Sequence, residues 1–356
     1  MTMQANAQAR SSANHAGDGV RSAGLRRAAW VGGALVVLAC AMVVLGLGIG
    51  STGLESLQGM LADPVALQIV WDIRLPRTLG AWAAGALLAL AGAVAQGLFR
   101  NPLADPYLLG SASGASLGVA LALAMFGVSP MAVQWIVRLG LTGAAFVGAV
   151  LAVLLTLVLA RGVQHTLRLL LSGVVVGVVL GACSSLVMLM VPEVMQSMQA
   201  FLLGSTGFVG WSACFLMLGL WVLCMLLSWA FRPVLDGLAL GEATAHSLGL
   251  PLAQMRMALI AVLALATATA VAQTGLIAFV GLAAPHLVRS VIKVRHGALV
   301  LISSLMGGAL LMAADLLARW LLAPQELPVG VLTAVLGGGY LLWLMHRGTS
   351  AMGARS

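Results

Sequence analysis

Long apolar runs without charges repeat along this chain and constrain its fold more than any other feature. The first, from Trp30 to Ile49, contains no charged residue. A helix needs about 20 apolar residues to cross roughly 30 Å of hydrocarbon, and the sequence divides into about ten such units. Because 61% of the residues are hydrophobic and only 8% are charged, we predict an all-α integral membrane protein. The expected segments are Trp30–Ile49, Thr78–Phe99, Tyr107–Phe126, Val137–Leu159, Leu169–Val191, Trp211–Phe231, Met255–Thr274, Leu276–Ile292, Ala298–Ala318 and Val329–Met345.

The 18 basic residues are distributed unevenly between the two predicted sides of the membrane. If the N-terminus is inside, all of them lie on the cytoplasmic side except Arg74, Arg77, Arg138 and Arg319. This distribution follows the positive-inside rule and predicts a multi-pass protein with both termini in the cytoplasm. Residues 1–27 are polar and rich in Ala, Ser and Gly, which predicts a disordered cytoplasmic tail. Residues 28–347 then form one transmembrane domain, and residues 348–356 form a cytoplasmic C-terminal tail.

One long polar stretch, residues 232–254, separates two groups of apolar segments. Within it, residues 238–248 are expected to form a short helix, with Gly237 before it and Gly249 and Pro251 closing it, because glycine and proline favour helix ends. The charge distribution places this stretch inside. A short helix held between two membrane spans on the cytoplasmic side favours a docking site for a partner.

Several segments are interrupted in ways that favour a transport pathway or close helix packing. The sequence RNPLADP contains two prolines that forbid a continuous helix. Met195 and Met198, which follow Pro192, have helical spacing and are interpreted either as a pathway wall or as a helix that packs on the bundle. Pro285 and His286 indicate a broken or tilted segment, as occurs where the backbone lines a cavity.

No motif for an energy source is found among these segments. A phosphate-binding loop needs a Gly-Lys-Ser/Thr ending, and the only lysine is Lys293, in VIKVR. Asp315 is the only candidate for a proton relay, but Arg319 lies four residues later on the same helix face, which favours an ordinary ion pair. No zinc spacing and no nucleophile with a base are present. These absences argue against an intramembrane enzyme and against a secondary carrier not driven by ATP.

Four long motifs carry a resemblance to a known family. They are RLPRTLGAWAAGALLALAGAVAQGLFRNPLADPYLLGSASGASLG, LALGEATAHSLGLPL, GLIAFVGLAAPHLVR and DLLARWLLAPQELPVGVLTAVLG. In this order they resemble the permease subunits of type II ABC importers, which import vitamin B12, haem and ferric siderophores. The similarity extends from about residue 30 to residue 347. It implies the type II importer permease fold and a bacterial inner-membrane location.

The resemblance also implies partners and the residues that contact them. It implies a homodimer, two ATP-binding cassette subunits that use ATP and Mg on the cytoplasmic side, and a periplasmic substrate-binding protein, with no cofactor bound by this chain. Residues 232–254 would be the coupling helices. The residues that match the family's ATPase contact are Leu240, Gly241, Glu242, His246, Leu248 and Gly249.

On the outer side, Arg74, Arg77 and Arg319 match the arginines that receive glutamates of the binding protein. A charge-assisted carboxylate contact would explain basic residues on the side where they are disfavoured. The alternatives are that Arg74 and Arg77 extend to the membrane interface, and that Arg319 pairs with Asp315.

The resemblance places an inner gate and a pathway between the two copies of the chain. The gate residues would be Asn101, Leu103, His165 and Thr166. The pathway residues would include Met188, Met195 and Met198. We therefore expect a permease that imports an iron chelate, with haem or a ferric siderophore preferred and vitamin B12 as the alternative.

Overall fold

The computed structural model describes residues 2–50, 53–54, 63–126, 135–163, 166–247, 249 and 251–353. Helices dominate these residues, and the two short strands pair antiparallel, with Ile49 opposite Leu54. The elements are α1 (Thr2–Gly48), β1 (Ile49–Gly50), β2 (Gly53–Leu54), α3 (Pro64–Ile69), the π-helical turn η1 (Val70–Arg74), α4 (Leu75–Phe99), α5 (Ser111–Phe126), α6 (Trp135–Leu159), α7 (Thr166–Met190), α8 (Glu193–Leu203), α9 (Trp211–Ala230), α10 (Arg232–Ala239), α11 (Glu242–Ser247), α12 (Leu252–Thr274), α13 (Val280–Val291), α14 (His296–Trp320) and α15 (Val329–Gly353).

Each of the ten predicted membrane segments coincides with a helix. In the described part of the chain, seven helices are long and apolar enough to cross a membrane. The helices α5 and α15 supply shorter apolar stretches, Ser111–Phe126 and Val329–Leu344. The remaining segment is α13, which is short, with only 12 residues, as expected, but continues through Pro285 without a break. The all-α membrane prediction is therefore confirmed.

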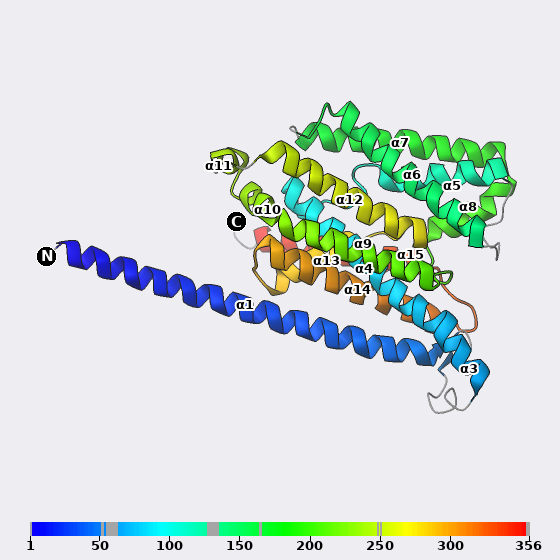
Figure 1. Cartoon of the computed structure of the whole chain (residues 1–356), viewed down its shortest axis with the longest axis horizontal. Coiled ribbons are helices and arrows are strands. Elements are labelled where there is room, and N and C mark those ends of the chain that lie inside the picture. Colours follow the sequence, from blue (N-terminus) through cyan, green and yellow to red (C-terminus); the bar gives the residue numbers. More distant parts are fainter. Residues whose placement is uncertain are drawn as a thin grey trace.

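Helix α4 lies at the centre of the bundle (Figure 1) and packs against α14, α12, α9 and α13. Its Ala- and Gly-rich sequence is buried on nearly all sides, and 89% of the residues in its most apolar 18-residue stretch are buried inside the protein. Small side chains allow its backbone to approach its neighbours closely. A Cβ atom added at Gly92 would lie 1.8 Å from the carbonyl oxygen of Gly281 on α13, and one at Gly85 would lie 2.3 Å from that of Gly307 on α14.

The coupling stretch and both ends of the chain lie at one end of the bundle. Figure 1 shows α10 and α11 at the same end as the N- and C-termini, whereas α3 is at the opposite end. The arrangement agrees with a topology in which both termini and residues 232–254 share one side of the membrane.

Three local expectations differ from the structure. Residues 2–27 continue α1 as a helix rather than forming a disordered tail, in keeping with the high helix propensity of alanine, and α15 continues to Gly353. The expected helix over residues 238–248 is two helices, α10 and α11, separated by Leu240 and Gly241. Gly237 is buried inside α10, so the break occurs at the second glycine.

Candidate functional site

The helix pair α10–α11 is the first candidate site, and its shape depends on one glycine. Gly241 adopts φ +108°, a conformation that side chains disfavour, and it reverses the chain between the two short helices. Leu240 beside it is 68% exposed, and His246 on α11 is exposed. Gly249 follows with φ +73°, and Leu248 lies outside the described residues. The pair therefore presents an apolar side chain and an imidazole at the end of the bundle.

An ion pair joins α11 to the membrane helix α12. The Arg256 guanidinium Nη1 lies 2.8 Å from Glu242 Oε1. Arg256 is buried at 4% exposure, and its Nη1 also donates to the Val163 carbonyl at 3.4 Å. The hydrogen bond from Arg256 holds the pKa of Glu242 below its usual value. Glu242 is thereby fixed to the bundle, although its side chain remains 38% exposed.

A second contact joins α10 to the start of α14. One carboxylate oxygen of Asp236, Oδ1, accepts a hydrogen bond from the His296 backbone N–H at 3.0 Å and lies 2.9 Å from His296 Nδ1. Asp236 therefore satisfies a free backbone donor in the first turn of α14. With the Glu242–Arg256 pair, it connects the two short helices to two different membrane helices, α12 and α14.

A buried cluster of charges lies at the opposite end of the bundle. Asp315 on α14 is completely buried and accepts hydrogen bonds from Arg77 on α4 at 3.2 and 3.3 Å, from Arg319, and from the Thr206 hydroxyl. Arg77 Nη1 also donates to both carboxylate oxygens of Glu326, at 2.8 and 3.0 Å. The expected Asp315–Arg319 ion pair is present, but within a larger network.

Two of the three predicted docking arginines are buried in this network. Arg319 is 2% exposed and Arg77 is 9% exposed, whereas a direct contact with a partner's carboxylate needs an accessible guanidinium. Arg74, at the end of η1, is half-buried and donates from Nη1 to the Leu47 carbonyl on α1 at 3.0 Å. In this conformation Arg77 and Arg319 hold α4, α14 and the loop after α14 together.

The predicted gate residues come from two connections. Asn101 follows α4 and accepts from the Leu103 N–H at 3.0 Å through its side-chain oxygen, which fixes a tight turn. Leu103 is 52% exposed at this turn. Thr166 begins α7 and is half-buried. His165 lies outside the described residues, so its position relative to the turn is not described.

The three predicted pathway methionines differ in exposure. Met195 is 52% exposed on α8, and Met188 on α7 is half-buried. Met198 is fully buried and packs with Ala115, Val119 and Val271. Met198 therefore belongs to the core of the single chain, and its pathway role stays a prediction. Helix α8 presents one methionine outward and uses the other as core, because residues three apart lie on partly different faces.

A polar cluster that the sequence did not indicate connects α4 to the short helix α13. Pro285 lies inside α13 and has no N–H to donate to the carbonyl of Gly281. The buried Gln96 Nε2 donates to the neighbouring Leu282 carbonyl at 3.2 Å, and Gln96 Oε1 accepts from Arg289. The Gly281 carbonyl faces Gly92, one turn before Gln96. One face of α4 thus contacts α13 around Pro285.

Sequence reasoning also missed Asp236, Arg256, His296, Thr206 and Glu326. Glu242 and Arg256 belong to different helices, and no periodicity connects them. Glu326 lies within the fourth motif, in PQELP, which was the only available signal. In the described part of the chain, no three His, Cys, Asp or Glu side chains are placed to hold a metal ion.

Comparison with known proteins places the chain in a class. Residues 34–347 match the FecCD transport family, and because this region covers most of the 356 residues, the chain belongs to that family. It is the permease subunit of an ABC importer, a multi-pass membrane protein and not an enzyme. Permeases of this kind dimerise and work with separate ATPase and substrate-binding partners.

Individual relatives agree with this assignment. The chain is 38% identical over 316 residues to the hemin transport system permease protein HmuU of Yersinia pestis, covering 86% of this chain and 93% of HmuU. It is 40% identical over 277 residues to the vitamin B12 import system permease protein BtuC of Escherichia coli O157:H7, covering 78% and 83%. A solved metal-chelate type ABC transporter in an inward-facing conformation superposes with a TM-score of 0.80 at 30% identity, covering 89% of this chain and 99% of the other.

Proposed function

We propose that this permease imports an iron chelate, preferentially haem or a ferric siderophore, from a periplasmic binding protein across the bacterial inner membrane. The alternative cargo is vitamin B12. Residues 28–347 form the transport unit, and both termini and the short C-terminal tail are cytoplasmic. Two copies of the chain form the pathway, and two ATP-binding cassette subunits on the cytoplasmic side bind ATP and Mg and drive the cycle.

The arrangement of α10 and α11 carries the coupling part of this proposal. A protein without its own phosphate-binding loop needs a rigid surface that receives a partner's motion. Leu240, Gly241, Glu242, His246, Leu248 and Gly249 form that surface. The two clamps, Glu242–Arg256 at 2.8 Å and Asp236–His296 at 2.9 Å, support this role because they prevent α10–α11 from moving independently of α12 and α14.

Two substitutions test the coupling surface separately. Leu240→Asp should weaken binding of the ATPase subunits by roughly 10- to 100-fold, since burial of a leucine contributes about 1.5–3 kcal/mol. Glu242→Lys places a cation beside buried Arg256 and should uncouple ATP hydrolysis from cargo uptake while the ATPase subunits remain bound. The measurements are co-purification, ATPase activity and uptake in proteoliposomes that contain the complete importer.

Matched controls lie at the other end of the molecule. Leu322→Asp changes an apolar side chain that is 52% exposed after α14, and Glu193→Lys changes an exposed carboxylate on α8. Both should leave ATPase binding and ATPase activity at wild-type levels. If Leu240→Asp and Glu242→Lys also leave assembly and uptake unchanged, α10–α11 is not the coupling surface.

On the outer side, we assign docking of the binding protein to Arg74, Arg77 and Arg319 through carboxylate exchange. The Glu326 carboxylate is 33% exposed, whereas Asp315 is fully buried. A glutamate of the binding protein can therefore replace Glu326 on Arg77 without disturbing the Asp315–Arg319 pair beneath it. Arg319 acts by positioning Arg77, and Arg74 supplies a second cation at the same end.

The inner gate and the pathway complete the proposal. Asn101, Leu103, His165 and Thr166 form the gate, and the exposed Leu103 at a fixed turn supports this role. Met188 and Met195 line the pathway. Their polarisable, flexible side chains suit a bulky apolar ring. Met198 supports Met195 from within the core.

Cargo is tested with the complete importer and its own binding protein. The similarity to the hemin permease covers more of both chains than the similarity to the vitamin B12 permease does, which supports the preference for an iron chelate. Uptake of haem, of ferric siderophores and of cobalamin is compared in the same proteoliposomes. ATP-dependent uptake of cobalamin alone would replace the iron chelate by vitamin B12, and uptake that persists without ATP would overturn the importer mechanism.

A further inference from the structure

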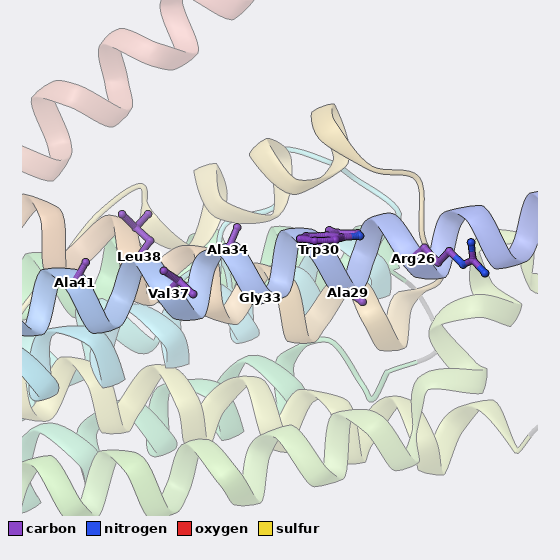
Figure 2. A pocket seen from close by; sticks show the side chains of 8 residues that line it. All are labelled: Arg26, Ala29, Trp30, Gly33, Ala34, Val37, Leu38 and Ala41. Atoms are coloured by element: carbon purple, nitrogen blue, oxygen red, sulfur yellow. The ribbon is translucent and has the colours of Figure 1, made fainter.

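A shallow apolar groove runs along the outward face of α1. It is lined by Arg26, Ala29, Trp30, Gly33, Ala34, Val37, Leu38 and Ala41. Figure 2 shows these side chains following one another along the helix, with Arg26 at one end and Ala41 at the other. The residues repeat at helical spacing, so they share one face. Small residues alternate along this face with the larger Trp30, Val37 and Leu38.

The groove has the length of one bilayer leaflet. From Arg26 to Ala41 the helix rises about 22 Å at 1.5 Å per residue, and half of a bilayer with its headgroups measures roughly 20–22 Å. Trp30 is 81% exposed and lies next to Arg26, at the level where tryptophan and arginine meet the interface. An extended acyl chain therefore fits the groove with its headgroup at Arg26.

Four exposed basic residues belong to α1 and to the connection that contacts it near the Arg26 end of the groove. Arg26 and Arg27 belong to α1, and Lys293 and Arg295 belong to the connection between α13 and α14. The connection contacts α1, since a Cβ atom at Gly24 would lie 3.9 Å from the Lys293 carbonyl oxygen, and Ala28 packs in the same apolar cluster as Val294. Within the described residues, none of these four side chains forms an ion pair, and the nearby Asp236 is held by His296.

We propose that this groove and the four basic side chains bind one anionic phospholipid, with its phosphate at the basic end and an acyl chain along α1. The positive charge complements a phosphate, and clusters of basic residues beside a membrane helix attract anionic lipids. The apolar groove favours a phospholipid over a purely ionic contact with a protein, because a phospholipid offers a long apolar chain attached to an anion. The site goes beyond cargo transport and does not depend on which cargo is carried.

The experiment measures lipid affinity on the full-length permease with its ATPase subunits. The purified complex is stripped of lipid and titrated with phosphatidylglycerol or phosphatidylcholine, and the bound lipids are counted by native mass spectrometry. The double variant Arg26→Gln/Arg27→Gln should raise the Kd of the tightest phosphatidylglycerol site roughly tenfold, since each basic residue near a membrane surface contributes about 1 kcal/mol and salt screens part of it. Affinity for phosphatidylcholine should not change.

Two further variants separate the charge from the groove. Arg161→Gln/Arg168→Gln removes two exposed arginines near the same side of the membrane and should leave the phosphatidylglycerol Kd unchanged. Gly33→Leu fills the groove, and a Cβ atom there has no neighbour within 4 Å, so the variant should fold and still lose affinity for phosphatidylglycerol. The proposal is overturned by an unchanged Kd in Arg26→Gln/Arg27→Gln, by an equal rise in the control, or by an unchanged Kd in Gly33→Leu. Loss of the ATPase subunits from Arg26→Gln/Arg27→Gln with lipid affinity intact would identify the basic cluster as a protein contact and overturn it too.

Discussion

Replacing Asp315 by alanine should destabilise the permease more than almost any other single substitution in α14. The carboxylate is fully buried and accepts from Arg77, Thr206 and Arg319. Without it, Arg77 still has Glu326, but among the described residues the 2%-exposed Arg319 retains only the Thr78 hydroxyl, at 3.3 Å, as a hydrogen-bond partner. Leaving one member of a buried pair without its partner costs about 3–5 kcal/mol.

At about 2 °C per kcal/mol for a chain larger than 250 residues, the apparent Tm should fall by roughly 6–10 °C. The assay is thermal unfolding of the detergent-solubilised permease at one scan rate, because membrane proteins of this size unfold irreversibly. The double variant Asp315→Leu/Arg319→Met replaces both charges with apolar groups and should recover most of the loss. A decrease in apparent Tm of less than about 2 °C for Asp315→Ala would refute the reasoning. So would a double variant that is less stable than the single variant.

Three other predictions follow from single contacts. Gly92→Ala should push α4 away from α13 and lower the free energy of unfolding by about 1–3 kcal/mol, measured as a lower Tm. Gly219→Ala is the control and should be neutral, because a Cβ atom there meets nothing within 4 Å. Equal effects of the two substitutions would contradict the close approach of α4 to α13. Glu326→Gln should raise the affinity for the binding protein several-fold in a pull-down titration, with Glu193→Gln as the control, because it frees Arg77; weaker binding would argue against carboxylate exchange. The pKa of Glu242 is lowered in the folded protein by its hydrogen bond from Arg256. The stabilisation of α11 by this contact is therefore present above the unfolded pKa of about 4.5 and is lost as the pH falls through the lower folded pKa. Hydrogen exchange of α11, corrected for intrinsic rates, should show this loss of protection, and Glu242→Gln should remove the pH dependence.

The number and positions of the membrane helices could be predicted from the sequence because burial in lipid requires one property, apolar length. The run from Trp30 to Ile49 has that property by itself, without reference to any other residue. The short eighth segment was equally local, whereas the break expected at Pro285 is absent, since α13 continues through it from Val280 to Val291. Such features depend on neighbours in sequence and need no knowledge of the tertiary structure.

Contacts between distant elements could not be predicted in the same way. Asp315 and Arg319 share one helix face, so their ion pair was expected. Arg77 on α4 also pairs with Asp315, and Glu326 in the loop after α14 pairs with Arg77, and neither contact could be read from the spacing of residues. The division of the coupling stretch at Gly241 rather than Gly237 also depends on packing, since Gly237 is buried against the bundle and has no reason to end a helix there. The docking contact was inferred from arginines on the outer side, and only the tertiary arrangement shows that Asp315 and Glu326 both pair with Arg77.

The central position of α4 has a consequence for the surrounding membrane. Of the most apolar 18-residue stretch of α4, 89% is buried, compared with 22% for α1 and 22% for α9, so α4 is surrounded by protein rather than by lipid. Changes in bilayer thickness therefore act on the outer helices through hydrophobic mismatch and reach α4 only after those helices tilt. Lipid composition is therefore expected to affect the lipid-exposed outer helices directly and the central helix α4 only indirectly.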